Sequence, residues 1–407
     1  MYYKRHIEST IKKAAGMFSA VLVTGARQVG KTSVLKESTK GLSYVTLDDQ
    51  LVLEAARNAP GTFLLDNTPP VFIDEIQYAP QLFPYIKMRA DEEGRNGLFY
   101  LSGSQQFQMM KNVSESLAGR LGILNLAGLS LREINKDSFT DIFIPSPDYF
   151  EKRKNSLKKL NHEKLWEIIQ RGSMPKLYAE VNSDWLMFYS AYVKTYIERD
   201  VHDLSQVGDS LKFIQFMTSV AGRTGQLLNM SSIASDIGIS IPTVDRWLSI
   251  LISSGIIFLL RPYSNNMIKR AVKTPKLYFL DTGLAAYLLK WNTRDVLKNG
   301  AMAGAFFETF VISEIIKSFY NNGIIDPPLY FYRDKEKNEI DLIIEHNRVL
   351  HPIEIKKHAD PRPQDIKSFN VIDKIQGVKR GSGGIICLYD KIISLSETDK
   401  VIPVSFI

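Results

Sequence analysis

The sequence V-L-V-T-G-A-R-Q-V-G-K-T-S at residues 21–33 fills the pattern G-x-x-x-x-G-K-[ST] without a mismatch. Apolar, β-favouring residues 20–23 begin it, and residues 32–38 can begin a helix, so the required order of strand, loop and helix is present. Gly25 and Gly30 let the backbone turn several N–H groups toward one anion, and the helix adds its positive N-terminal end. The stretch therefore predicts a phosphate-binding loop.

The side chains of this loop predict ATP or ADP as ligand and Mg²⁺ as cofactor. Lys31 can reach the β- and γ-phosphates, and the Thr32 hydroxyl can hold Mg²⁺. Arg27 and Gln28 are bulky for such a loop, so we expect their side chains to point away from the phosphates or to cover the nucleotide. The residues predicted to contact the nucleotide are Gly25, Ala26, Arg27, Gln28, Val29, Gly30, Lys31, Thr32 and Ser33.

A second element of the same site is predicted at residues 70–77, P-V-F-I-D-E-I-Q, where an apolar strand ends in two acids. Asp74 would support the Mg²⁺, directly or through water. Glu75 lies where a base can polarise the attacking water. A third strand, at residues 98–101, ends in Ser102 and Ser104, which either contact the γ-phosphate or the water, or simply form a turn.

Further polar residues of this region allow two interpretations each. Asp48 and Asp49 follow a strand at residues 42–47 and either face the ligand or, as we favour, cap the next helix. Arg120, between two glycines, is either a surface residue or reaches a γ-phosphate of its own subunit or of a neighbour. Arg199, at the end of a helix predicted for residues 185–203, is either part of an ion-paired joint or a second arginine of this kind.

Composition bounds the remaining possibilities. The 407 residues are enough for two or three domains, and 44% are hydrophobic, enough for a core throughout. The formal net charge of +7 permits contact with nucleic acid but does not require it. Cys387 is the only cysteine, which excludes disulfides within the chain and suggests a cytoplasmic location. Because no apolar run approaches about 18 residues, we expect a soluble protein without membrane contact.

The middle of the chain is predicted to be helical. Residues 148–210 read as a helical lid or linker, and residues 211–290 follow the pattern of a winged helix-turn-helix. On its third helix Thr243, Asp245, Arg246 and Ser249 are expected to be exposed, where they could lie in a DNA major groove. Such modules also pack as lids on ATPase domains, and Asp245 is unfavourable near phosphates.

The C-terminal part, residues 300–407, carries a second candidate site. Glu354 and Lys356 are two apart on one predicted strand and so share a face, and Asp341 lies on a neighbouring strand. With Glu308 from a preceding helix, these groups could hold Mg²⁺ at Asp341 and Glu354 and polarise a water, as in restriction-endonuclease-like nucleases. The alternative is an exposed sheet face with its charges in rows.

The ordered series of motifs resembles a family of bacterial and archaeal AAA-superfamily ATPases that carry a C-terminal domain of unknown function. The motifs are T-G-A-R-Q-V-G-K-T, L-D-D, F-I-D-E-I-Q, L-S-G-S-Q and S-L-A-G-R, and the similarity continues through Y-I-E-R-D-V, K-L-Y-F-L-D-T-G-L, F-F-E, E-I-D-L-I-I-E and P-I-E-I-K. It covers nearly the whole chain and implies a restriction-endonuclease-like fold at the C-terminus, without implying an activity there.

Together these features predict an α/β protein with four parts. They are a P-loop ATPase domain with a parallel sheet (1–147), the helical region (148–210), the winged helix (211–290) and a restriction-endonuclease-like domain (300–407). The expected function is Mg²⁺-dependent ATP hydrolysis coupled to the C-terminal modules, acting on DNA. The alternative is a nucleotide-gated switch that binds DNA or protein, hydrolyses little ATP and has an inactive C-terminal domain. A protein partner or self-association is expected in either case.

Overall fold

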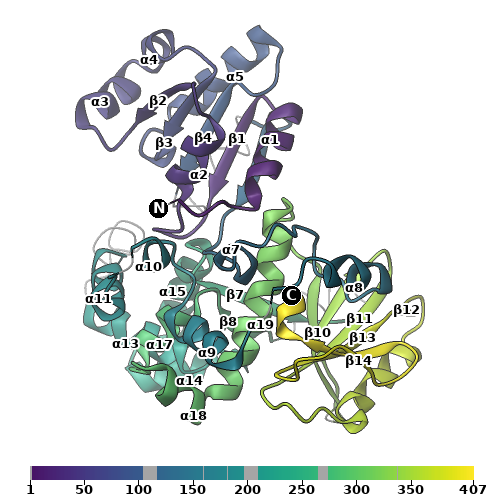
Figure 1. Ribbon diagram of the computed structural model, residues 1–407. Coiled ribbons are helices and arrows are strands. Elements are labelled where there is room, and N and C mark those ends of the chain that lie inside the picture. Colours follow the sequence, from purple (N-terminus) through teal and green to yellow (C-terminus); the bar gives the residue numbers. More distant parts are fainter. Residues whose placement is uncertain are drawn as a thin grey trace.

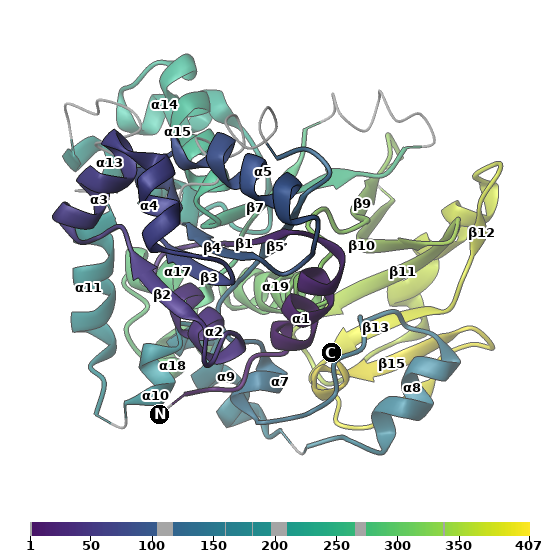
Figure 2. The same ribbon diagram turned by 90° about the horizontal axis from the view of Figure 1, so that it is seen from above.

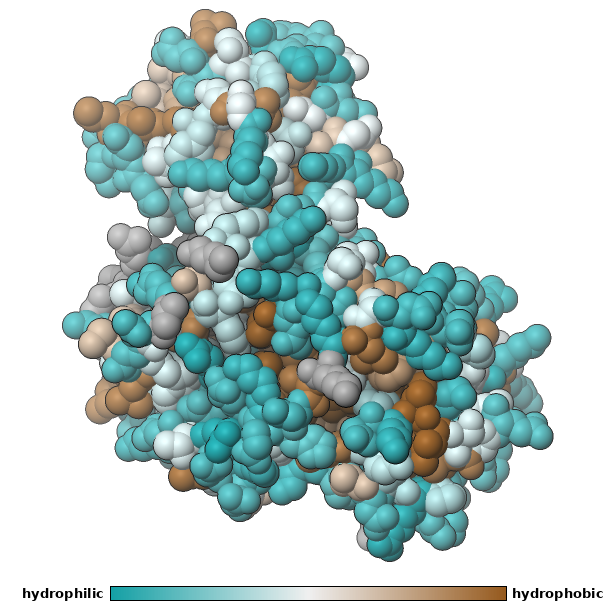
Figure 3. Space-filling view, viewed as in Figure 1, coloured by the Kyte–Doolittle hydropathy of each residue, from teal (hydrophilic) through white to brown (hydrophobic). Residues whose placement is uncertain are grey.

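The structure is a computed structural model and describes residues 2–103, 117–158, 160–180, 182–196, 210–264, 274–336 and 338–407. Figure 1 shows an N-terminal lobe above a larger body formed by the rest of the chain. Figure 3 shows that the molecule narrows at the junction between the two and that this face is largely hydrophilic. Among the described residues, none of the helices has the length and apolarity needed to cross a bilayer.

The N-terminal lobe is built on a five-stranded parallel sheet, which confirms the α/β prediction for this part. The strand order is β2-β3-β4-β1-β5. The strands are β1 (Ala20–Thr24), β2 (Ser43–Thr46), β3 (Val71–Asp74), β4 (Phe99–Gly103) and β5 (Leu121–Asn125). The helical segments are α1 (Ile7–Met17), α2 (Lys31–Ser38), α3 (Gln50–Asn58), α4 (Pro60–Asp66), η1 (Ile76–Tyr78) and α5 (Leu82–Glu93).

Both faces of this sheet are covered, because successive side chains of a strand point to opposite faces. Val21 and Val23 of β1 belong to the large core that includes α1 and the rest of the molecule. Ala20 and Leu22 belong to a separate core with α3, α4 and α5. The sheet therefore holds β1, and the loop that follows it, rigidly.

Two residues of this lobe have packing roles that spacing alone does not show. Gly122 of β5 makes room for the Phe18 ring, because a Cβ at this position would lie 2.7 Å from it. Arg5, just before α1, is only 3% exposed.

The middle segment contains the helices α7 (Leu131–Ile134), α8 (Pro147–Lys154), α9 (His162–Arg171), α10 (Lys176–Ala179), α11 (Trp185–Tyr196), α13 (Ser210–Ala221), α14 (Met230–Ile237), α15 (Ile241–Ser253), α17 (Thr282–Leu288) and α18 (Arg294–Asn299). Its strands are β6 (Gln226–Leu227), β7 (Ile257–Pro262) and β8 (Lys276–Phe279), with β8 antiparallel to both others. The order α13-β6-α14-α15-β7-β8 is compatible with a winged helix, which stays a prediction.

The C-terminal part begins with the long helix α19 (Ala303–Asn321), which is buried nearly all round. Every residue from 309 to 321 is buried, and Figure 2 shows α19 lying among α17, α1 and the C-terminal strands. The remaining elements are β9 (Leu329–Arg333), β10 (Glu339–His346), β11 (Val349–Lys356), η3 (Pro363–Lys374), β12 (Lys379–Arg380), β13 (Gly383–Cys387), β14 (Ile393–Ser394), β15 (Asp399–Pro403) and η4 (Val404–Phe406).

One sheet runs through the middle and C-terminal parts. Its order is β14-β15-β13-β11-β10-β9-β7-β8-β6, with β12 paired to β11. The link is the parallel pair β7 and β9, joined at Arg261–Tyr330 and Pro262–Phe331. A boundary between residues 290 and 300 therefore does not separate two independent sheets, and the division into four domains stays a prediction.

Candidate nucleotide site and C-terminal acidic site

The phosphate-binding loop runs from β1 to α2, as predicted, and its two glycines are required by its geometry. Gly25 has φ +145°, and a Cβ on it would lie 2.0 Å from the carbonyl oxygen of Leu126. Gly30 has φ +94°, in the left-handed region that favours glycine. The chain can therefore approach β5 and turn into α2 only with glycine at these positions.

Lys31 is the cation of the loop, and in this structure its ammonium group is bonded to the loop itself. Its Nζ donates to the carbonyl oxygens of Gly25 (3.0 Å) and Ala26 (2.9 Å), and the side chain is buried. These contacts hold the charge over the mouth of the loop. To bind a phosphate, the ammonium group has to exchange carbonyl oxygens for phosphate oxygens.

Asp74 ends β3 and gathers three hydroxyl groups. Its Oδ1 accepts from the Thr32 hydroxyl (3.0 Å) and from Ser102, and its Oδ2 accepts from Tyr44 (3.2 Å). The structure thus brings together the two predicted Mg²⁺ ligands, Thr32 and Asp74. Hydroxyl and carboxylate oxygens are the donors that Mg²⁺ prefers, so this pair fits the expected ion.

Ser102 and Tyr44 support the acids. Ser102 is fully buried, and its hydroxyl also accepts from the backbone N–H of Glu75 (3.2 Å), so it is bonded to both acids, and its contact with a γ-phosphate stays a prediction. The contact of Tyr44 with Asp74 was not predicted, because the sequence does not show that the strand containing Tyr44, β2, lies beside β3. Ser104, the other serine proposed to sense the γ-phosphate, lies outside the described residues.

Glu75 occupies a strained backbone position next to Asp74. Its φ of +57° is rare for a residue with a side chain, and such positions gather at functional sites. Burial, opposed by the charge of Lys31, raises the pKa of its carboxyl, and the Gln77 amide donates to it. A carboxylate with a raised pKa is suited to accept a proton from water.

Lys31, Thr32 and Glu75 line a pocket of about 630 Å³, and Asp74 reaches it through its bond with Thr32. The N-terminal Tyr2 and Tyr3 and the region around α10, with Pro175 and Lys176, also contribute to its walls. Arg27 and Gln28 also line it, and whether they cover the nucleotide or point away from its phosphates stays a prediction. The pocket is thus shared between the N-terminal lobe and the middle segment.

Arg5 links this pocket to the rest of the molecule. Its guanidinium donates to the carbonyl oxygens of Val29 (2.8 Å) and Ala127 (2.8 Å), and its Nε pairs with Glu133 (3.1 Å). Because Glu133 belongs to α7, the buried Arg5 joins the phosphate-binding loop to the helix that leaves the lobe.

Arg120 lies away from the phosphate-binding loop. It directly precedes β5, and β5 starts beside the start of β1, so Arg120 lies at the end of the sheet opposite the loop. Its side chain pairs with Asp91. Its role at a γ-phosphate, of its own subunit or of a neighbour, stays a prediction. Arg199 lies outside the described residues.

Asp49 confirms the favoured interpretation of the L-D-D motif. Its Oδ1 accepts from the backbone N–H groups of Leu51 (2.9 Å) and Val52 (3.3 Å), the geometry of an N-cap. Asp48 is exposed beside it.

The C-terminal candidate residues do converge. Asp341 and Glu354 lie on the adjacent strands β10 and β11, and the Asp341 Oδ2 accepts from the backbone N–H of Ile355 (2.9 Å). The ammonium group of Lys356 pairs with Glu354 and lies 3.9 Å from the Asp341 Oδ2. The alternative of an exposed, charged sheet face is wrong here, since both acids are buried.

Residues that the sequence did not indicate complete this cluster. Lys276 of β8 lies among Glu308, Glu339 and Asp341, and Tyr278 donates to the Glu308 Oε1 (2.6 Å). The acidic site, as the term is used below, consists of Lys276, Tyr278, Glu308, Glu339, Asp341, Glu354 and Lys356. Nothing in the spacing of Lys276 pointed to it, because its neighbours come from distant elements.

The electrostatics of the acidic site reflect an excess of carboxylates. Burial and the charge of Asp341 raise the pKa of Glu308 to about 7 and that of Glu354 to about 8. In the part of the chain that the structure describes, no group of three His, Cys, Asp or Glu side chains is arranged to hold a metal ion. The predicted metal at Asp341 and Glu354 thus stays a prediction.

Three family descriptions match successive parts of the chain. They are "AAA domain" at residues 18–135, "Domain of unknown function (DUF8612)" at 162–295 and "Domain of unknown function (DUF4143)" at 303–407. The chain is 27% identical over 359 residues to uncharacterized proteins of Mycobacterium tuberculosis and Mycobacterium bovis, covering 88% of this chain and 75% of each relative.

Two solved structures show weaker likeness. The Walker-type ATPase PABY2304 of Pyrococcus abyssi has a TM-score of 0.45 at 14% identity, covering 70% of this chain and 96% of that one. A signal transduction ATPase with a tetratricopeptide repeat sensor from Pyrococcus horikoshii has a TM-score of 0.26 at 10% identity, covering 80% and 48%. The "AAA domain" match and the site geometry together identify residues 18–135 as an AAA-type P-loop domain.

Proposed function

We propose that this chain is a Mg²⁺-dependent ATPase whose nucleotide state controls its middle and C-terminal parts. The observation that carries the proposal is that Lys31, Thr32 and Glu75 line one pocket at the ends of β1 and β3, with Asp74 bonded to Thr32 beside it. The AAA-type domain supports the choice of a nucleotide as ligand.

Each side chain has a separate task in the proposed reaction. Lys31 leaves the carbonyl oxygens of Gly25 and Ala26 and binds the β- and γ-phosphates. Thr32 and Asp74 hold Mg²⁺, which neutralises phosphate charge when bound. Glu75, kept in place by Ser102 and Gln77, orients the attacking water and accepts its proton.

The contacts of the loop favour a switch over an isolated ATPase. Arg5 bonds the loop carbonyl of Val29 and pairs with Glu133 of α7. On the other side, a Cβ on Gly255, in the turn between α15 and β7, would lie 3.3 Å from the backbone nitrogen of Ala26. A loop that moves on binding nucleotide would therefore displace both α7 and the start of β7.

The test is steady-state ATP turnover with Mg²⁺. We expect Lys31→Ala to lose nucleotide binding, and Glu75→Gln to bind ATP and turn it over at least about 100-fold more slowly. The exposed Lys87→Ala and Glu54→Gln are matched controls and should behave as wild type. Equal turnover in wild type, Lys31→Ala and Glu75→Gln would refute hydrolysis at this site.

A second candidate is a nucleotide-gated module that binds DNA or protein with little hydrolysis. It is favoured by α15, on which Asp245, Arg246 and Ser249 are exposed. Phosphate contacts would make binding to duplex DNA fall steeply with salt, and Arg246→Ala should reduce that slope by about one. Absence of binding at low salt would leave protein partners.

For the acidic site we propose a restriction-endonuclease-like arrangement with Asp341, Glu354, Lys356 and Glu308 as its functional groups. The pairing of Asp341 and Glu354 on one sheet face supports it. If the site is active, Mg²⁺ or Mn²⁺ supports cleavage of DNA or RNA, and Asp341→Ala abolishes cleavage without unfolding the protein. If it is a remnant, Asp341→Ala leaves every nucleic-acid assay unchanged.

A further inference from the structure

The ammonium group of Lys276 lies at the centre of the acidic site. It is 2.7 Å from the Glu339 Oε1, 3.7 Å from the Glu308 Oε1 and 3.9 Å from the Asp341 Oδ1, so three carboxylates share one cation. The Lys276 side chain is only 6% exposed. Its pKa is raised because the neighbouring carboxylates outweigh the burial that lowers it, so it stays charged.

Lys276 belongs to a different part of the chain from the acids. It lies on β8, which is paired with β6 and β7 of the middle segment, whereas its partners come from α19 and β10. Its ammonium group also lies 5.5 Å from the centre of the Phe331 ring. The middle segment thus contributes one positive charge to a site whose carboxyl groups all come from the C-terminal segment.

The site remains short of positive charge even with this lysine. Four carboxyl groups, from Glu308, Glu339, Asp341 and Glu354, face two ammonium groups and, 4.0 Å from Glu339, the guanidinium of Arg333. Glu354 is only 7% exposed, and its Oε2 is buried without a hydrogen-bond partner. An unpartnered buried carboxylate oxygen is costly, and a small multivalent cation would satisfy it.

From these contacts we infer that Lys276 is the resident cation of the acidic site and that its ammonium group keeps a divalent cation out. The cation that Lys276 excludes is Mg²⁺ or Mn²⁺, because the acidic site offers carboxylate oxygens as metal ligands and these ions prefer oxygen ligands. The middle segment would then regulate the site by placing or withdrawing Lys276. This inference deepens the proposed function of the acidic site, but it is tested by metal binding and not by cleavage.

The experiment is calorimetric titration of the full-length chain with MnCl₂ in the absence of nucleotide. Lys276→Met keeps the apolar stem of the side chain and removes its charge. This variant should bind one Mn²⁺ at the acidic site with a dissociation constant at least tenfold lower than that of the wild-type chain. Adding Asp341→Asn should remove the gain. Lys276→Arg, which keeps a cation, should not gain the site.

Lys317→Met is the matched control, because Lys317 is equally buried and pairs with a single acid, Glu314, at 2.7 Å. It should gain no Mn²⁺ site. If Lys276→Met does not fold, the double variant Lys276→Met with Glu339→Gln removes the closest ion pair as a unit and should gain the site in the same way.

Three results would overturn the inference. The first is equal Mn²⁺ binding by wild type and by the folded Lys276 variants. The second is a gain that persists with Asp341→Asn. The third needs no lysine variant: if Asp341→Asn alone lowers the Mn²⁺ stoichiometry of the wild-type chain, the site already holds a metal beside Lys276.

Discussion

Two features of Gly25 exclude any residue with a side chain: its backbone conformation and the close approach of a neighbouring carbonyl oxygen. Its φ is +145°, and the carbonyl oxygen of Leu126 occupies the place of a Cβ. We therefore expect Gly25→Ala to lower the free energy of unfolding and to abolish ATP binding, because the loop must shift away from β5.

Gly41→Ala separates the two causes. Gly41 also has a positive φ, +88°, but nothing lies within 4 Å of its missing Cβ. Its substitution should cost only the conformational strain, about 1–2 kcal/mol, and leave ATP binding intact. Chemical denaturation and fluorescent-nucleotide binding measure both quantities, and an equal effect of the two substitutions would refute the steric account.

The carboxyl groups of Glu308 and Glu354 make stability depend on pH. Burial raises the pKa of Glu308 from 4.5 to about 7 and that of Glu354 from 4.5 to about 8. Between pH 4.5 and these raised values the folded chain therefore binds more protons than the unfolded chain. As far as these groups are concerned, the free energy of unfolding should therefore be highest below about pH 4.5, fall as the pH rises from about 4.5 to about 8, and level off above that.

Glu354→Gln should flatten this decline, since the amide does not titrate. Glu397→Gln, at an exposed position, is the control and should keep the wild-type slope. Denaturation curves from pH 5 to 9 compare the three proteins. An unchanged slope in Glu354→Gln would show that its carboxyl is not the group responsible.

Among the elements, α19 connects the two candidate sites. Near its start Glu308 belongs to the acidic site, and further along Glu314 accepts from the backbone N–H of Leu131 (2.6 Å). Lys317 donates to Glu314 (2.7 Å) and to the carbonyl oxygen of Leu129 (3.1 Å). The helix is thus bonded directly to the chain that leaves β5.

Glu314→Ala tests the strength of this joint. It leaves the Leu131 N–H and the Lys317 ammonium group without their carboxylate, so we expect a loss of about 3–5 kcal/mol in the free energy of unfolding. The exposed pair of Glu37 and Lys40 has the same i,i+3 spacing, and Glu37→Ala should cost at most about 0.5 kcal/mol. Similar losses in both variants would mean that α19 is not anchored by this pair.

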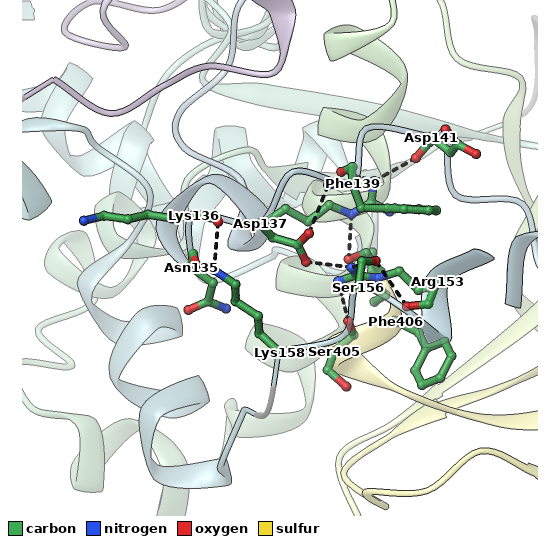
Figure 4. A network of polar contacts seen from close by, with 12 residues as sticks. Asn135, Lys136, Asp137, Phe139, Asp141, Arg153, Ser156, Lys158, Ser405 and Phe406 are labelled. Atoms are coloured by element: carbon green, nitrogen blue, oxygen red, sulfur yellow. Dashed lines mark hydrogen bonds and ion pairs between the residues drawn. The ribbon is translucent and has the colours of Figure 1, made fainter. Parts of the chain in front are cut away.

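At the scale of the whole molecule, a second joint ties the exit from the N-terminal lobe to η4, the 3-10 helix that follows the last strand (Figure 4). Arg153 of α8 bonds Asp137 (2.6 Å) and the carbonyl oxygen of Ser405 (2.8 Å), and both charged side chains are only 3% exposed. Lys158 adds bonds to the carbonyl oxygens of Asn135 (2.7 Å) and Lys136 (2.8 Å). The lobe is thus bonded to the C-terminal part of the chain in two places, through α19 and through this network.

The sequence predicted those parts of the site that depend on local order. The loop from Gly25 to Ser33 and the acids Asp74 and Glu75 are set by strand ends, and parallel strands bring their ends together without further information. Asp341, Glu354 and Lys356 followed from the alternation of side chains on strands.

The rest of the site depends on contacts between distant elements, which spacing does not show. Arg5 is buried because Glu133 and Val29 surround it, and Lys276 is central because β8 joins the sheet of β9 and β10. The position of Arg120, which pairs with Asp91, could not be predicted, because a short glycine-flanked segment does not reveal at which end of the sheet it lies.

The central claim is that nucleotide at the phosphate-binding loop changes the C-terminal part of the molecule. Hydrogen exchange of the full-length Glu75→Gln variant, with and without Mg²⁺-ATP, tests it most directly. Our account predicts that ATP changes exchange in α7, α19 and β8 as well as in the loop, and that Lys31→Ala removes all of these changes. Changes confined to residues 25–33 and 74–75, with α19 and β8 unaffected, would contradict it.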